Sequence, residues 1–329
     1  MRPSTSGIGV SPYLPGGSPP ARARAAAASG LETELAVSAP GLLASIRVRD
    51  FVSLTKPRVV LMIVVTTAVA FHLGSAARPD WVQLWHTLAG TALAAGGTLA
   101  LNQFLERVSD ALMWRTRDRP LPSGRLTPNE ALWFGGLALA IGLGYLTIMV
   151  GWLAGAVTLA TAGLYLGLYT PLKRWTPLCT LVGAIPGALP PVTGWAAAQG
   201  KLAVGAAVLF AILFFWQIPH TLAIARLYQA DYARAGIRVM PVVHPDGVST
   251  DRQMVVGCLA LLIVALVPTL VTLTGWVYFV GACVLGLAFL ACGVRHALAP
   301  SRNSARWMVL ASVLYLPVLL ALMVLDKAA

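Results

Sequence analysis

Two adjacent stretches near the C-terminus decide the fold class: "MVVGCLALLIVALVPTLVTLT" (residues 254–274) and "WVYFVGACVLGLAFLACGV" (residues 276–294). Both are free of charged side chains, and each has about the 20 apolar residues that a helix needs to cross the hydrocarbon core of a membrane. Their apolar residues follow one another without the alternation of a barrel strand. Since lipid offers no partner for exposed peptide groups, both stretches are predicted to be transmembrane helices.

Comparable stretches recur along the chain after residue 45, and the composition supports the same conclusion. Of the 329 residues, 57% are hydrophobic and only 11% are charged, whereas soluble domains have about 25% charged residues. We therefore predict an all-α integral membrane protein. Its nine predicted transmembrane helices are residues 59–77, 83–104, 131–149, 152–170, 177–199, 203–224, 254–274, 276–294 and 307–325.

The first 45 residues have a different composition. They are rich in Pro, Gly, Ser, Ala and Arg, as in "SPYLPGGSPPARARAAAASG" (residues 11–30), and show no apolar period. We predict a disordered N-terminal extension over residues 1–45 and a membrane-embedded domain over residues 46–329. The arginines also suit a transit peptide, but no amphipathic helix is visible there.

The net charge of +12 follows the predicted topology. Basic residues lie between apolar stretches rather than in a patch interleaved with aromatic residues, which argues against nucleic-acid binding. Loops rich in Lys and Arg are typically cytoplasmic. One side has Lys56, Arg58, Arg107, Arg115, Arg117, Arg119, Arg125, Lys173, Arg174, Arg226, Arg234, Arg238, Arg252, Arg295, Arg302 and Arg306, and the other side Arg78, Lys201 and Lys327. We expect a cytoplasmic N-terminus and a C-terminus on the opposite side.

Acidic residues concentrate in the two longest cytoplasmic loops. Asn102, Glu106 and Asp110 are spaced i, i+4, i+8, which places three oxygen-bearing side chains on one helical face at the membrane boundary. Such oxygens suit Mg²⁺, which takes one or two carboxylates and completes its shell with water and phosphate oxygens. Arg115 and Arg119 follow at i, i+4, a spacing that suits a grip on phosphate. The alternative is a solvated loop whose acids neutralise its arginines.

The second loop begins within "FFWQIPHTLAIARLYQADYARAGIRVMPVV" (residues 214–243). His220 and Asp231 are eleven residues apart, so they share a helical face if the helix continues past Pro219. Trp216 lies one turn before His220. The alternative is that His220 is structural and that Asp231 caps a helix or pairs with Arg234.

At these residues the sequence resembles the UbiA superfamily of intramembrane prenyltransferases, from about Asp50 to the end of the chain. The matching segments are "LTKPRVV", Asn102 through "MWRTRDRPLPSGR", "YTPLKR", "GAIPGALPPVTGW", "FFWQIPHTLAIA" and "DYARAGIRVMPVV". "RTRDRPLPSG", "GALPPVTGW" and "WQIPH" are specific to the branch that prenylates heme. The sequence departs from the family's acidic motifs at Glu106, which replaces Asp, and at Val108 and Ala230, where relatives carry a further acid.

The resemblance implies a UbiA-type bundle with a central cavity open to the cytoplasmic side of the bacterial inner membrane. It implies transfer of the farnesyl group of farnesyl diphosphate to a vinyl group of heme B, which gives heme O. The implied cofactor is Mg²⁺. The implied partners are both substrates, membrane lipid, and heme A synthase or terminal oxidase assembly factors. The implied site comprises Asn102, Glu106, Asp110 and Asp231 as catalytic residues and metal ligands, Arg115, Arg119, Lys173 and Arg174 on the diphosphate, and His220 and Trp216 on heme.

Three alternatives remain at this stage. Another UbiA-type enzyme, which prenylates a quinone precursor or a chlorophyll-type alcohol, shares the diphosphate site. A secondary transporter also uses repeats and broken helices, but its charged residues lie near the middle of the membrane. A purely structural subunit gives no reason for acids and arginines to gather in the same loops.

Overall fold

A computed structural model describes residues 47–75 and 79–328. The chain divides into two compact units, residues 1–48 and 49–329. The first unit, and with it the predicted disordered extension, lies almost entirely outside the described residues. In the described part of the second unit, apart from one isolated bridge between Thr274 and Lys327, the regular elements are helices. The all-α prediction is therefore confirmed.

A helix occupies each of the nine predicted positions. The helices are α2 (Pro57–Gly74), α3 (Trp81–Leu112), α4 (Pro128–Met149), α5 (Trp152–Gly163) continued by η1 (Leu164–Tyr169) and α6 (Thr170–Leu172), α7 (Cys179–Ala188) and α8 (Pro190–Gln199), α9 (Val204–Leu227), α12 (Val248–Leu270), α13 (Trp276–Leu298) and α14 (Arg302–Leu325). Two short helices, α10 (Gln229–Arg234) and α11 (Met240–Val243), follow α9. Within the described ranges, eight segments are long and apolar enough to cross a membrane, and α3 is not among them. The count of nine crossings stays a prediction.

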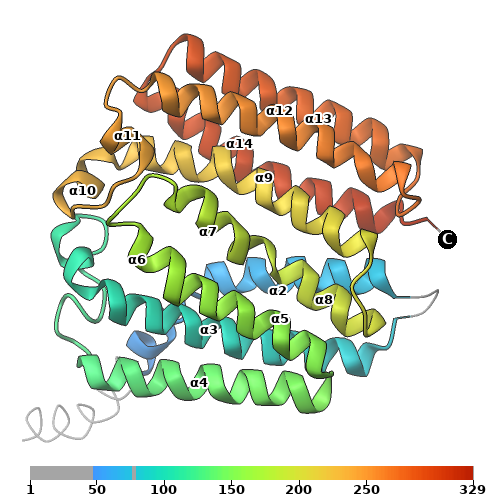
Figure 1. Ribbon diagram of the computed structural model, residues 1–329, viewed down its shortest axis with the longest axis horizontal. Coiled ribbons are helices and arrows are strands. Elements are labelled where there is room, and N and C mark those ends of the chain that lie inside the picture. The colour runs from blue at the N-terminus through green and yellow to red at the C-terminus, as the bar shows by residue number, and fades with distance from the viewer. Residues whose placement is uncertain (1–46, 76–78, 329) are drawn as a thin grey trace, which may run out of the picture. The chain divides into compact units, whose positions relative to one another are not determined.

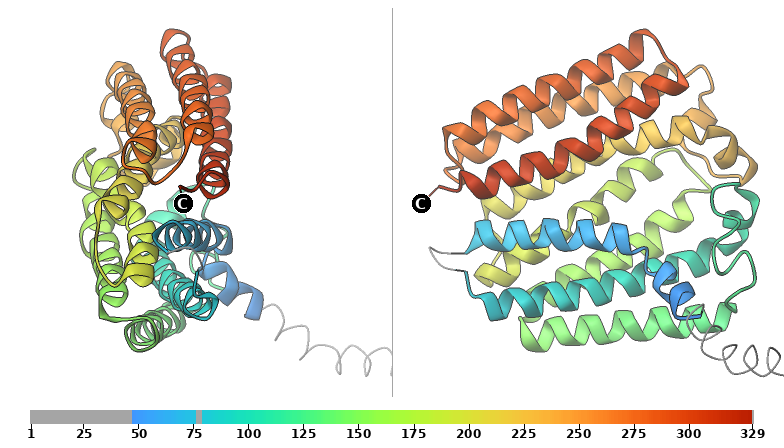
Figure 2. Two further views of the ribbon diagram at one scale, coloured as in Figure 1. Left: turned by 90° about the vertical axis from the view of Figure 1, so that its right-hand side faces the viewer. Right: turned by 180° about the vertical axis from the view of Figure 1, so that it is seen from behind.

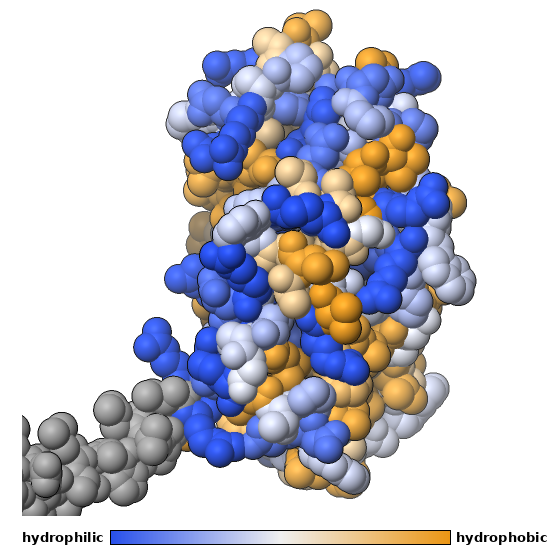
Figure 3. Space-filling model, turned by 90° about the vertical axis from the view of Figure 1, so that its left-hand side faces the viewer, coloured by the Kyte–Doolittle hydropathy of each residue, from blue (hydrophilic) through white to orange (hydrophobic). Residues whose placement is uncertain are grey.

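Neighbouring helices in the chain pack as pairs, and other contacts join distant parts of the sequence. α3 packs on α4, and α12 and α14 both pack on α13 (Figure 1). α2 packs against α8, and α14 packs against α9 (Figure 2). The loop between α3 and α4 (residues 113–127), α10 and α11 lie together at one end of the bundle, here called the loop end, and the C-terminus lies at the other. Figure 3 shows the loop end, where hydrophilic side chains surround patches of hydrophobic ones.

The segment "GAIPGALPPVTGW" (residues 183–195) is divided between two helices. α7 ends at Ala188, and α8 begins at Pro190, whose ring nitrogen has no hydrogen to continue the helical ladder. At Gly194 in α8, an added Cβ would overlap the Thr67 carbonyl oxygen of α2. Glycine at this position therefore allows α8 and α2 to approach closely, which fixes the broken segment against the first helix.

Exposed tryptophans mark both ends of the bundle. Eight of the ten tryptophans are exposed. Trp81, Trp85, Trp152 and Trp276 lie where helices begin at the end opposite the loop end, and Trp114, Trp133, Trp175 and Trp307 lie at or near the loop end. Tryptophan gathers at membrane–water interfaces because its ring is both apolar and polar. The two belts agree with a multi-pass membrane protein.

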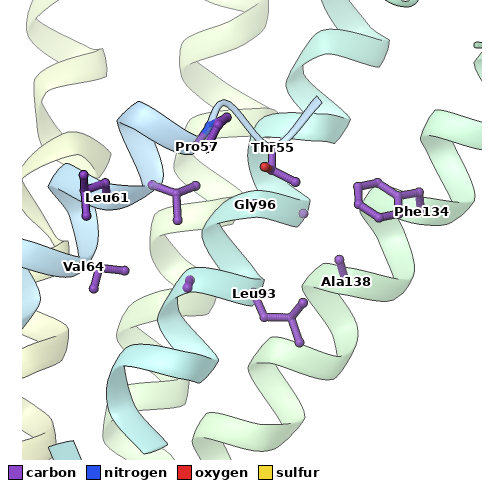
Figure 4. Close-up of a pocket in the computed structure, with 11 residues that line it drawn as sticks. Thr55, Pro57, Leu61, Val64, Leu93, Gly96, Phe134 and Ala138 are labelled. Atoms are coloured by element: carbon purple, nitrogen blue, oxygen red, sulfur yellow. The ribbon is translucent and has the colours of Figure 1, made fainter. Parts of the chain in front are cut away.

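The surface between the belts is apolar. A groove of about 380 Å³ lies between α2, α3 and α4 and is lined by residues that include Thr55, Pro57, Leu61, Leu93 and Phe134 (Figure 4). Leu61 is 61% exposed and Leu93 is 39% exposed. Apolar side chains with this exposure belong on a surface that faces lipid rather than water.

Candidate active site

The last turns of α3 carry the predicted acidic face into the interior of the loop end. α3 continues eight residues past the predicted span and ends at Leu112, so Asn102, Glu106 and Asp110 lie on one helical face as expected. Asn102 and Asp110 are each only 1% exposed, and Glu106 is partly buried. Buried polar groups are costly without partners, which requires that other segments supply them.

Each of these side chains is met by a basic side chain from another part of the chain. Lys173 Nζ lies 2.6 Å from Glu106 Oε1, and Arg119 NH1 lies 2.7 Å from Asp110 Oδ2. Lys56 Nζ donates to Asn102 Oδ1 at 3.3 Å. Burial alone would raise the pKa of Glu106, but the charge of Lys173 and its hydrogen bond outweigh burial and lower that pKa.

Sequence reasoning did not include Lys56 in the site. Its backbone has φ 50° and ψ 67°, a left-handed conformation that is uncommon for residues other than glycine. It directly precedes Pro57, the first residue of α2, and this bend lets its ammonium reach Asn102. Burial, with the nearby charge of Arg119, lowers the pKa of Lys56 to about 8. The feature of the sequence that could have identified Lys56 is its place in "LTKPRVV", a segment at the predicted membrane boundary.

A π-helix orients Asn102. Over η1 the helix that began as α5 widens by one residue per turn, a feature often found at functional sites. Thr170, which follows η1, accepts from Asn102 Nδ2 at 3.1 Å and donates to the Tyr165 carbonyl at 2.8 Å. Because the amide nitrogen is fixed by Thr170, the amide oxygen points to Lys56. The same segment places Lys173 over the ring of Tyr169, 4.2 Å from its centroid.

The other two predicted phosphate-binding arginines are more peripheral. Arg174 donates to Ser109 Oγ on α3 at 3.0 Å. Arg115 is exposed and lies over the ring of Tyr228, 4.6 Å from its centroid, and it donates to the Tyr232 hydroxyl at 3.3 Å. Arg119 and Lys173 are therefore brought to the acidic face, Arg174 reaches its edge, and Arg115 connects the first loop to the second.

The predicted helical face shared by His220 and Asp231 is wrong. α9 does continue past Pro219, but it ends at Leu227, and Tyr228, with φ −115° and ψ 25°, leaves the helical conformation. Asp231 lies on the separate helix α10, where it is 9% exposed and forms an ion pair with Arg234 three residues later. That pairing was the alternative left open by the sequence.

The two loops are tied together beneath their charged surface. The backbone N–H of Arg238 in the second loop donates to the Lys173 carbonyl at 2.7 Å. Met113 after α3, Cys179 of α7 and Ile237 of the second loop belong to one small buried apolar cluster. The position of Lys173 therefore depends on both loops.

His220 and Trp216 lie together on α9 and contact α14. Their rings are stacked, with centroids 4.8 Å apart and planes 14° apart. His220 Nδ1 lies 2.7 Å from Ser312 Oγ, and Trp216 Nε1 donates to the Ser312 carbonyl at 2.9 Å. Ser312 is fully buried. No pattern in the sequence singles out this serine within an apolar span.

The charge around the end of α3 suits an anion. Four cationic side chains, Lys56, Arg119, Lys173 and Arg174, surround a face with two carboxylates. Among the described residues, no three His, Cys, Asp or Glu side chains form a group that could hold a metal ion. The arrangement is therefore a partly buried cationic site with carboxylate and amide oxygens on one wall, which favours a polyanionic ligand that brings oxygens of its own.

Comparison with known proteins defines the class to which this fold and site belong. The sequence pattern of the UbiA prenyltransferase family matches residues 63–323, and the chain belongs to that family. A protein from Solibacter usitatus (strain Ellin6076) named protoheme IX farnesyltransferase is 49% identical over 85% of this chain and 99% of its own length. One of the same name from Koribacter versatilis (strain Ellin345) is 44% identical over 91% of this chain and 99% of its own length.

Solved structures show the same fold at low identity. A digeranylgeranylglyceryl phosphate synthase is 15% identical with a TM-score of 0.71, over 85% of this chain and 98% of that chain. A UbiA homologue from Archaeoglobus fulgidus bound to GPP and Mg²⁺ is 16% identical with a TM-score of 0.59, over 83% of this chain and 99% of that chain. The predicted UbiA-type bundle is confirmed.

Proposed function

We propose that the chain transfers the farnesyl group of farnesyl diphosphate to a vinyl group of heme B and so forms heme O. The observation that carries this proposal is the cationic site at the end of α3, in a chain 49% identical to a protein named for that reaction. Its charged groups lie at or near helix ends: in the last turns of α3, directly before α2, in the α3–α4 loop and after α6. This position disfavours a secondary transporter, whose charged residues lie near the middle of the membrane.

The diphosphate binds at the cationic wall. When the allylic carbon–oxygen bond breaks, its electron pair moves to the diphosphate, so negative charge grows on the leaving group. Lys56, Lys173 and Arg119 stabilise that charge, and their partial burial strengthens each interaction relative to water. Lys173 and Arg119 exchange part of their contact with Glu106 and Asp110 for contact with phosphate oxygens.

Mg²⁺ fits the oxygen donors on this wall of the site. The amide oxygen of Asn102 and the carboxylates of Glu106 and Asp110 are hard oxygen donors on one helical face, and Mg²⁺ needs only one or two protein carboxylates when phosphate oxygens complete its shell. Bound there, Mg²⁺ would supply further positive charge to the diphosphate. Asp231 is the fourth proposed ligand; it lies on α10 in the second loop and pairs with Arg234. The Mg²⁺-bound archaeal homologue supports this reading.

The heme acceptor binds next to Trp216 and His220, where apolar side chains surround the site. Water must be excluded while the allylic cation forms, because water would trap it, and a membrane-embedded site provides that exclusion. The vinyl π electrons form the new carbon–carbon bond, and the positive charge moves to the carbon next to the porphyrin. One water molecule then adds to that carbon and loses a proton, which gives the hydroxyl group of the product. The products are heme O, diphosphate and one proton.

We place the loop end on the cytoplasmic side of the bacterial inner membrane, with the C-terminus on the opposite side. Support comes from the 16 Lys and Arg residues predicted on that side of the membrane domain, against three on the other. Figure 1 agrees with this sorting, since the α3–α4 loop, α10 and α11 lie at one end and the C-terminus at the other.

The test is expression in a bacterial host that lacks its own heme O synthase, followed by pigment extraction and mass analysis. We expect a pigment with the mass of heme O from cells with the wild-type chain, and none from cells with Asp110→Asn at equal membrane abundance. A prenylated quinone precursor without heme O would instead support the other UbiA-type activity. If a correctly inserted wild-type chain forms neither product, the proposal is refuted.

A further inference from the structure

Ser312 of α14 contacts His220, Val309 and Trp216, and the two contacts of its hydroxyl determine the protonation of His220. Its hydroxyl oxygen lies 2.7 Å from His220 Nδ1 and 2.6 Å from the Val309 carbonyl oxygen. Its own carbonyl accepts from Trp216 Nε1 at 2.9 Å. The imidazole is also stacked on the Trp216 ring, so the position and the plane of His220 are both fixed.

The hydroxyl has one proton, and the Val309 carbonyl can only accept. Ser312 therefore donates to Val309 and offers a lone pair to His220, which must donate from Nδ1–H. A neutral imidazole carries a single N–H, so its Nε2 holds an unshared electron pair. No hydrogen bond from any residue in the described ranges reaches Nε2 of His220.

His296 provides an internal contrast. Its Nδ1 also lies 2.7 Å from a serine hydroxyl, that of Ser304. Its Nε2, however, lies 3.5 Å from Asp251 Oδ1, and the ring is 1% exposed. That imidazole is enclosed by groups of the protein on both edges, whereas His220 is only partly buried and presents its Nε2 without such a partner from the described chain.

We propose that Ser312 is a positioning residue that holds His220 as the Nδ1–H tautomer, so that Nε2 ligates the iron of the porphyrin acceptor. A metal-binding histidine characteristically donates its other N–H to an oxygen, which fixes the tautomer and increases the basicity of the ligating nitrogen. Ser312 plays that part here through a hydroxyl already oriented by Val309. This inference rests on the proposed function, because it takes heme as the acceptor.

The experiment uses the purified full-length chain in detergent with two probes, iron protoporphyrin IX and metal-free protoporphyrin IX. Loss of the oxygen partner of a ligating histidine typically weakens metal binding about 10-fold to 100-fold. Ser312→Ala should therefore weaken binding of the iron porphyrin about 10-fold, with binding of the metal-free porphyrin within about 2-fold of wild type. His220→Ala should abolish the preference for iron. Trp216 keeps its partner in Ser312→Ala because that partner is a backbone carbonyl.

Resonance Raman spectra of the ferrous complex supply a second readout. Wild type should show an iron–histidine stretching band, which moves to lower frequency in Ser312→Ala and disappears in His220→Ala. His86→Ala is the matched control, since His86 is also partly buried with its Nδ1 2.7 Å from a hydroxyl, that of Tyr145, at the far end of α3. It should leave both readouts unchanged.

Two results would overturn the inference. One is an unchanged iron-porphyrin affinity and band in Ser312→Ala, and the other is an equal loss for both porphyrins. If these occur while wild type still forms heme O, the proposed function stands and only the role of Ser312 fails. If wild type binds neither porphyrin and forms no heme O, the proposed function itself fails.

Discussion

Lys173 Nζ lies 2.6 Å from Glu106 Oε1 and joins the end of α6 to the face of α3 across 67 residues of sequence. Both side chains are 15% exposed. A buried pair of this kind is costly to break on one side, because the remaining charge is left uncompensated. The same pair is suited to exchange, since an incoming diphosphate can replace the carboxylate on Lys173 while a cation replaces Lys173 on the carboxylate.

Glu106→Gln should reduce Mg²⁺-dependent farnesyl transfer by about 100-fold or more, because a neutral amide holds Mg²⁺ less well than a carboxylate and the loss of one group that stabilises the developing anion costs about that much. Asp110→Asn should reduce farnesyl transfer by a similar factor. Both changes conserve volume, so membrane insertion and the elution profile of the purified protein should match wild type. The measurement is the initial rate as a function of Mg²⁺ concentration. Glu106→Asp should be milder, because it keeps the charge. Full activity in both amide variants would show that this face has only a structural role.

Lys173→Ala should weaken binding of farnesyl diphosphate far more than Arg115→Ala does. Lys173 is buried beside Glu106, whereas Arg115 is exposed and held by two tyrosine rings, and charge interactions weaken with exposure to water. We expect losses of about 10-fold to 100-fold and about 3-fold respectively, measured by calorimetric titration, with porphyrin binding unchanged in both. Arg117→Ala, in the same loop and exposed, is the control and should have no effect. An equal loss in all three variants would indicate long-range charge rather than a site.

Reporter fusions can test the orientation. A reporter fused after Gly124 or after Gly236 should report the cytoplasm, and one fused after Gly200 should report the opposite side, because Lys and Arg resist translocation. All three glycines have positive φ and lie in turns. A reporter after Gly124 on the same side as one after Gly200 would mean that the helical segments between them, α4, α5 to α6 and α7 to α8, do not make three crossings, and this would end the nine-span model.

Much of the fold and the first half of the site were predictable because they depend on local patterns. The apolar stretches and the spacing of Asn102, Glu106 and Asp110 each reflect interactions within one segment. Long-range contacts were not visible in such patterns. Lys56 reaches Asn102 only because its backbone is left-handed, and Thr170 does so only because η1 shifts the register of the helix.

The second half of the site shows the same limit. The eleven-residue spacing of His220 and Asp231 suggested one helix, but the chain leaves the helix at Tyr228, where its ring packs under Arg115 from a different loop. Ser312 is a single hydroxyl in an apolar span, and its importance depends on α14 packing beside α9. Contacts between segments that are distant in sequence determine both features.

Gly194→Ala should lower the midpoint of thermal unfolding, because a Cβ there overlaps the Thr67 carbonyl and forces α8 away from α2. Overpacking of this kind costs about 1–3 kcal/mol. Gly136→Ala is the matched control, since an added Cβ on α4 meets no atom within 4 Å and alanine is the better helix former by about 1 kcal/mol. Thermal unfolding in detergent should thus separate the two variants in opposite directions. Equal midpoints for both would show that the α2–α8 contact can relax without cost.

Lys56 should make binding of farnesyl diphosphate weaken in alkaline solution. Its pKa is lowered to about 8, first by burial and then by the charge of Arg119, so the ammonium is charged below pH 8 and loses its proton as the pH rises through 8. A bound diphosphate favours the charged form and raises this pKa again. One linked proton then predicts that the dissociation constant increases about 8-fold between pH 7.5 and pH 9. Lys56→Arg stays charged throughout this range, so its affinity should be nearly flat. The measurement is calorimetric titration at each pH, and a flat wild-type profile would show that Lys56 does not contact the diphosphate.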